Sequence, residues 1–297
     1  MKQNTFKKGI FYAAISASGW GISGVCSQFL FSEYGVDSSW LTAIRMIFSG
    51  IILLIIALYQ KSELFAIYKN KADCFQLFIF AILGLLLCQY AFLSAIKYSN
   101  SGTATVLQSL NVILMAIVVA WMSHTKLTFK QFLSIFLAIL GTYFITTNGN
   151  PSEMVLSFSG LCWGLLSAVG VITYILLSQR IIKIWGNVLV IGWGMLIGGI
   201  ILGIMVQAWN IPTNLDFFAF VIIAIIISIG TVVGFSLFLE GSKLIGPMKA
   251  TLIGCLEPVS ATILSACLLG TTFGTVEILG FCAIMTTVLL SMNKNES

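Results

Sequence analysis

A glutamate followed by a proline, Glu257-Pro258, lies inside a long apolar stretch of this 297-residue chain. Charged groups are costly inside hydrocarbon, so they are usually paired or functional there. Proline lacks a backbone N–H and frees carbonyl oxygens in the preceding turn. Glu257 is therefore the leading candidate to bind a substrate amine or to accept a proton. The alternative is a structural glutamate paired with Arg45 or hydrogen-bonded to a neighbouring helix.

An internal repeat places an amide at the position that corresponds to this carboxylate. With an offset of 146, residues 90–140 lie opposite 236–286 without a gap, and Asn111 is the mate of Glu257. Gln108 lies one turn before Asn111 on the same helix face. The two amides form a polar stripe that can orient a solute between apolar walls. Hydrogen bonding between helices explains the stripe equally well.

Aromatic and hydroxyl residues recur at helical spacing in two other stretches. Spacings of three, four or seven place them on common helix faces; they are Trp20, Ser23 and Ser27 in one stretch and Trp163, Ser167 and Tyr174 in the other. Each residue alone is read as a packing contact. As a group they predict the wall of a substrate cavity.

Arg45 lies about six residues into its apolar stretch from the predicted outer end. It is a candidate for coupling or gating, and the plainer expectation is that it snorkels or pairs with Glu33 or Asp37 at the outer mouth. Weaker candidates are Tyr90 as a substrate contact and Glu240 as a gate.

The composition indicates a membrane protein, because 59% of the residues are apolar, 8% are charged and the mean hydropathy is +1.04. Helices of about 20 residues cross the hydrocarbon core. Ten apolar stretches of this kind are predicted, at 9–31, 39–59, 74–96, 102–121, 127–147, 157–179, 186–208, 217–239, 248–268 and 275–292.

An odd number of stretches in each copy inverts the second copy relative to the first. The chain is therefore expected to be an all-α membrane protein of ten transmembrane helices, built as two inverted five-helix repeats, 1–150 and 151–297. Basic residues are retained on the cytoplasmic side of membranes. Thirteen of the fifteen Lys and Arg fall on the side of the N-terminus, and Lys97 falls on the other. Both termini are expected to be cytoplasmic.

Several function classes lack the residues they need. The seven cysteines form no CxxC pair and His124 is the single histidine, so neither a metal nor a cofactor is expected. HExxH, GxSxG and paired carboxylates are absent, which disfavours a membrane-embedded enzyme. Nucleic-acid binding is disfavoured because no basic patch is interleaved with aromatics.

The full length of the chain resembles the EamA-type drug/metabolite transporter superfamily. The resemblance rests on the ten-stretch layout, the Trp-Gly pairs that start at Trp20 and Trp163, Arg45, and the LEP of Leu256–Pro258. Strings such as WGISGVCSQ and TATVLQ resemble a bacterial branch, which implies an inner-membrane location. Many relatives have proline where this chain has Val112. The helix break that the family implies there is open, whereas Pro258 retains it in the second copy.

The resemblance implies a carrier of amino acids, other small metabolites, sugar phosphates or drugs. We expect a secondary transporter with alternating access, exporting amino acids or amines from a site between stretches 1, 3, 4, 6, 8 and 9, with proton coupling as an option. A multidrug or lipid-linked translocator, a channel and an enzyme are the alternatives. The expected partners are the lipid bilayer and a small molecule, and the chain is expected to be a monomer or homodimer.

Overall fold

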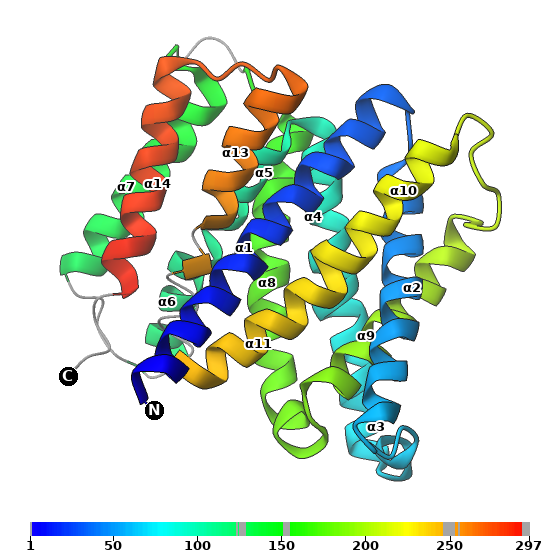
Figure 1. The fold of residues 1–297 in the computed structure, drawn as a ribbon. Coiled ribbons are helices and arrows are strands. Elements are labelled where there is room, and N and C mark those ends of the chain that lie inside the picture. Colours follow the sequence, from blue (N-terminus) through cyan, green and yellow to red (C-terminus); the bar gives the residue numbers. More distant parts are fainter. Residues whose placement is uncertain are drawn as a thin grey trace.

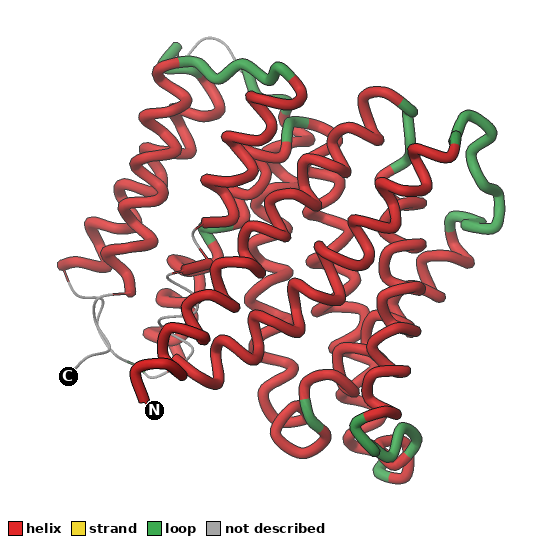
Figure 2. The backbone as a smooth tube through the Cα atoms, in the orientation of Figure 1, coloured by secondary structure: helices red, strands yellow, loops and turns green. Residues whose placement is uncertain are grey.

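The computed structural model describes residues 2–122, 124, 129–150, 155–245, 253–254 and 256–292. Within these ranges the regular structure is entirely helical, as Figure 2 shows, and no strand occurs. The prediction of an all-α membrane protein is confirmed to this extent.

The helices follow one another with short connections (Figure 1). In chain order they are α1 Lys2–Glu33, α2 Ser38–Tyr59, η1 Ala66–Lys69, α3 Lys71–Ile79, η2 Phe80–Leu86, α4 Leu87–Tyr98, α5 Ser101–Gln108, α6 Asn111–Met122, α7 Phe129–Thr147, α8 Phe158–Trp185, α9 Asn187–Met205, α10 Phe217–Ile225, η3 Ile226–Val233, α11 Gly234–Ile245, α13 Leu256–Leu269 and α14 Thr275–Met292.

Among the described residues, 6 helical segments are long and apolar enough to cross a membrane. They are Phe6–Glu33, Ser38–Tyr59, Lys71–Tyr98, Phe158–Trp185, Asn187–Met205 and Phe217–Phe238. The predicted stretches at 102–121, 127–147, 248–268 and 275–292 are not among these segments. Three of them contain the shorter apolar segments Ile135–Thr147, Leu256–Leu269 and Thr275–Thr286. The first part of the 248–268 stretch lies largely outside the described residues.

The predicted fourth stretch is broken at its middle, although it has no proline there. α5 ends at Gln108, Ser109 and Leu110 form a turn, and α6 begins at Asn111. The Asn111 side chain donates to the Gln108 carbonyl at 2.7 Å, and the Ser109 hydroxyl donates to the Thr105 carbonyl at 2.9 Å. Such bonds compete with the helical ladder. The break that the family resemblance left open is therefore present.

Two π-helical segments, η2 and η3, interrupt the helices that continue on either side of them. They begin at Phe80 and Ile226, so their starts are also separated by 146 residues. Each contains a glycine in tight contact: a Cβ at Gly84 would lie 3.0 Å from Tyr174 Cα, and one at Gly230 would lie 2.3 Å from Ser23 Cβ. π segments inside helices often occur at functional sites.

Helices from the first half of the sequence pack against helices from the second half. α2 packs against α9, α4 and η2 against α8, α1 against η3 and α11, and α7 against α14, as the side-by-side α7 and α14 in Figure 1 illustrate. Glycines allow the close approach, since a Cβ at Gly199 would lie 2.7 Å from Ile47 N and one at Gly170 2.6 Å from Cys88 Cα. The start of α1 and the end of α14 lie at the same end of the bundle.

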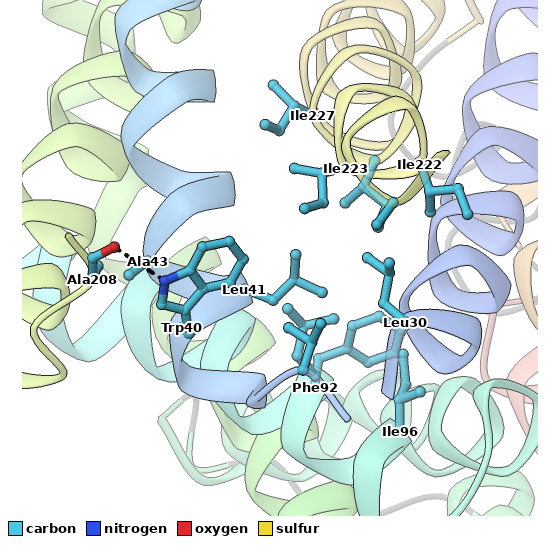
Figure 3. Packing of buried hydrophobic residues seen from close by; sticks show 14 of the residues in the cluster. Leu30, Trp40, Leu41, Ala43, Phe92, Ile96, Ala208, Ile222, Ile223 and Ile227 are labelled. Carbon is cyan, nitrogen blue, oxygen red and sulfur yellow. Dashed lines mark hydrogen bonds between the residues drawn. The ribbon is translucent and has the colours of Figure 1, made fainter. Parts of the chain in front are cut away.

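The largest apolar cluster joins α1, α2, α4 and α10 near the other end of the bundle (Figure 3). Leu30, Leu41 and Phe92 meet Ile222 and Ile223 there. At its edge, Trp40 Nε1 donates to the Ala208 carbonyl at 3.0 Å. This cluster ties the first half of the chain to α10 and holds α2 in the position from which Arg45 points inward.

Candidate functional site

A cavity of about 210 Å³ lies beside the break between α5 and α6. Its walls come from α1, α2, α4, α5, α6, α8, α11 and α13, and therefore from both halves of the chain. The lining residues are Trp20, Arg45, Cys88, Gln89, Phe92, Thr105, Gln108, Ser109, Asn111, Val112, Val171, Tyr174, Ile175, Phe235, Phe238, Gly254, Glu257 and Pro258.

The cavity brings together six of the residues predicted from the sequence, namely Trp20, Arg45, Gln108, Asn111, Tyr174 and Glu257. Four others lie away from its lining. The Ser23 side chain is buried against η3, and the Trp163 and Tyr90 rings stack edge to face with centroids 5.2 Å apart. Glu240 is exposed on α11.

Arg45 does not pair with the acids at the end of α1, contrary to the plainer expectation. It is 4% exposed, and its Nε donates to Thr231 Oγ1 in η3 at 2.8 Å. Asp37 instead forms an ion pair with Lys97 at 2.6 Å. The reason is direction: the buried face of α2 turns Arg45 toward η3, whereas Asp37 precedes α2 and caps it through the Ser39 N–H.

Glu257 stands in the first turn of α13, half-buried at the cavity wall. Its carboxylate accepts no hydrogen bond from any described residue. Within the described residues, the ion pairs with N···O of 4.0 Å or less are Lys97–Asp37 and Arg180–Asp73. Arg45 and Glu257 thus line the same cavity but do not form an ion pair with each other. The alternative of a direct Arg45–Glu257 pair is not realised in this structure.

Aromatic side chains form the apolar part of the cavity. The Trp20 ring lies 5.5 Å from Phe235 and 5.1 Å from Phe238, measured between centroids. Trp20 Nε1 is buried and has no hydrogen-bond partner among the described residues. Phe235, Phe238 and Cys88 were not predicted from the sequence. The two phenylalanines are three residues apart on α11 and Cys88 precedes Gln89, but apolar residues in an apolar stretch do not stand out from their neighbours.

A polar cluster ties α1 to α5 and α13 at the end of the bundle opposite the N-terminus. Gln28 Nε2 donates to Thr271 Oγ1 at 3.0 Å, and Gln28 Oε1 accepts from the Ser101 N–H at 2.8 Å and from Ser265 Oγ at 3.0 Å. Next to it, Thr103 Oγ1 donates to Glu277 Oε1 at 3.0 Å. We call Gln28, Ser101, Ser265 and Thr271 the Gln28 cluster; it joins the two halves on that side.

A second polar cluster lies toward the opposite end of the same bundle, where α3 meets α8. The buried carboxylate of Asp73 accepts from Arg180 Nη2 at 2.8 Å and from Trp185 Nε1 at 3.0 Å. Gln76 joins it through Arg180 Nη1 at 3.0 Å. Polar contacts between the first and second halves of the chain therefore occur toward both ends of the bundle.

Across the ranges that the structure describes, no group of three or more His, Cys, Asp or Glu side chains could hold a metal ion. The cavity offers one cation, one carboxylate, three side-chain amides and several aromatic rings. This set is suited to binding a small solute by charge, hydrogen bonds and apolar contact.

Long apolar helices with a partly polar cavity between them define a multi-pass membrane protein. The sequence model of the EamA-like transporter family matches residues 7–147 and again residues 158–293. The chain therefore belongs to this family. Membership indicates that it is a membrane transporter rather than an enzyme.

Two named relatives agree with this assignment. The chain is 36% identical over 289 residues to the "Uncharacterized inner membrane transporter YicL" of Salmonella typhimurium, covering 96% of this chain and 95% of the relative. It is 25% identical over 266 residues to the "Uncharacterized transporter YyaM" of Bacillus subtilis, covering 85% and 82%. A solved structure described as "Crystal structure of protein" matches 100% of both chains with a TM-score of 0.64 and 12% identity, a likeness of fold alone.

Proposed function

We propose that the chain is a secondary transporter built from two inverted five-helix repeats, 1–150 and 151–297, that form ten transmembrane helices. The offset of 146 between η2 and η3 supports the repeat. The packing supports it too, because α4 and η2 against α8 corresponds to α11 and η3 against α1. Inverted repeats that enclose a site are a common architecture of secondary transporters.

The observation that carries the proposal is the cavity between the halves. Arg45 and Glu257 both line it, and neither forms an ion pair within the described residues. Unpaired charges inside a membrane protein are costly and are retained mainly for function. The break between α5 and α6 lies beside them, and non-helical backbone at membrane depth is tolerated where it lines a cavity. The two halves alternate access by rocking about this point.

In the proposed cycle the cargo is a small metabolite such as an amino acid or an amine, moved outward across the bacterial inner membrane. Glu257 is the charge partner of the cargo amine or the carrier of a coupled proton. Both termini face the cytoplasm. The connection after α2 and the end of α8 lie at the same end of the bundle as the start of α1. These segments carry Lys61, Lys69, Arg180 and Lys183, which supports the proposed orientation.

The test is counterflow in proteoliposomes with the variant Glu257→Gln, which keeps the shape and removes the charge. We expect counterflow of the wild type to saturate with solute concentration. In the variant we expect counterflow to fall about tenfold or more, or to lose its dependence on pH, because a charge-assisted hydrogen bond contributes about 1.5–3 kcal/mol.

Glu33→Gln, at the exposed end of α1, is the matched control and should leave counterflow unchanged. Unchanged transport and unchanged pH dependence in Glu257→Gln would remove Glu257 from the mechanism. Flux that does not saturate and shows no counterflow would indicate an open pore and contradict the transporter cycle.

A further inference from the structure

Arg45 presents an unused hydrogen-bonding edge to the cavity. Its Nε is held by Thr231 Oγ1, while its two Nη atoms have no hydrogen-bond partner among the described residues. The side chain is 96% removed from solvent, since its exposed fraction is 4%. A guanidinium offers a planar fork of N–H donors that fits the two oxygens of a carboxylate.

Thr231 sets the direction of this fork. It is fully buried in η3, and its hydroxyl contacts both Arg45 Nε at 2.8 Å and the Ile226 carbonyl, five residues earlier, at 3.3 Å. The hydroxyl can donate to the carbonyl and accept from Nε at the same time. This arrangement holds Arg45 by one nitrogen and leaves the other two for a ligand.

The charge balance of the cavity selects among solutes. Arg45 and Glu257 both line it, and the distance between their charged groups is too long for an ion pair. An amine without a carboxylate would neutralise Glu257 and leave the guanidinium unpaired. A carboxylate without an amine would leave Glu257 unpaired. A buried charge without a partner costs several kcal/mol.

We infer that the cavity recognises a zwitterion, with Arg45 binding its carboxylate, Glu257 its ammonium group, and Trp20, Phe235 and Phe238 its apolar side chain. Arg45 thereby determines specificity, and Thr231 is its positioning residue. The inference rests on the proposed function and narrows its cargo from amino acids or amines to molecules that carry both charges.

The experiment measures binding to the purified full-length protein by isothermal titration. The probes are phenylalanine, leucine and alanine, each beside the matching amine that lacks the carboxylate and the matching acid that lacks the amine. In the wild type at least one amino acid should bind more than tenfold tighter than both of its fragments. Arg45→Met should weaken that amino acid by about tenfold to a hundredfold and leave its amine within about threefold.

Two further variants separate specificity from folding. Lys183→Met removes an exposed cation on α8 outside the cavity and should change no affinity. Thr231→Val keeps the side-chain size and should weaken the amino acid several-fold without affecting the amine. If Arg45→Met does not fold, the ratio of amino acid to amine affinity in Thr231→Val decides.

Equal weakening of amino acid and amine in these variants, or a wild type without preference for zwitterions, would overturn the inference. If the inference failed in this way but an amine or another solute still showed counterflow, the proposed function would remain supported. Absence of counterflow with every probe would count against both.

Discussion

Asp37 and Lys97 show how an exposed pair can be strongly ordered and still contribute little stability. Partial burial by itself raises the pKa of Asp37, but hydrogen bonds from Lys97 and Ser39 outweigh it and hold the pKa at about 2. The side chain of Asp37 is 55% exposed and that of Lys97 is 32% exposed. Solvent therefore screens the pair, and we expect a contribution below about 1 kcal/mol.

The first prediction follows from that lowered pKa. An unfolded aspartate titrates near 3.9, so the stability from Asp37 is present above about pH 4 and is lost as the pH falls toward 2. Asp37→Asn should lower the thermal midpoint slightly at pH 7 and reduce its fall between pH 5 and pH 3, measured in detergent. Lys97→Met should give a similar loss at pH 7. An unaltered slope in Asp37→Asn would contradict the assignment.

Arg45 marks the limit of prediction for single residues. Its charge inside an apolar stretch identified it as functional or paired, yet chain proximity favoured Glu33 or Asp37 as its partners. The structure shows Thr231 instead, 186 positions away in sequence. Contacts of this range depend on which helix face turns inward, and the sequence of α2, apolar on most sides, does not determine that.

At the scale of elements, the break between α5 and α6 occurs without the proline that usually marks it. Proline was the expected cause, and Val112 stands in its place. Asn111 and Ser109 hydrogen-bond carbonyls within the break. The π segments η2 and η3 were not predicted at all. Their hydrogen-bond shift has no distinct composition, and only their common offset relates them to the repeat.

The second prediction concerns the Gln28 cluster, which joins α1, α5 and α13. Gln28→Met keeps the length of the side chain but leaves the Ser101 N–H without its acceptor and removes one of the two donors to Thr271 Oγ1. Unsatisfied buried groups cost about 1–3 kcal/mol, so the thermal midpoint should fall clearly. Gln60→Met, exposed at the end of α2, is the matched control and should cost less than about 0.5 kcal/mol. Equal midpoints for the two variants would show that the cluster does not stabilise the bundle.

On the scale of the whole molecule, contacts between distant segments hold the two halves together. α2 with α9 and α7 with α14 join segments from different halves of the chain, and glycines set their distance. The start of α1 and the end of α14 lie at one end of the bundle (Figure 1).

The third prediction tests the orientation that the basic residues indicate. Glu63 and Thr213 are exposed in loops at opposite ends of the bundle. In a chain whose native cysteines are replaced, a membrane-impermeant thiol reagent should label Thr213→Cys from outside intact cells. Glu63→Cys should be labelled only after the membrane is opened. The reverse pattern would place the N-terminal side outside.

Hydropathy and the offset of 146 were enough to predict an all-helical membrane protein and most helix positions, because apolar length and repeated spacing are properties of the chain itself. The family was indicated by a resemblance in motifs such as the Trp-Gly pairs and the LEP of Leu256–Pro258. Glu257, Asn111 and Gln108 could be singled out because polar groups contrast with apolar surroundings. The tertiary structure decided which of the candidates share one cavity, that Arg45 turns to η3, and that phenylalanines complete the wall. These outcomes depend on how helices rotate and approach one another, which is set by packing across the whole bundle.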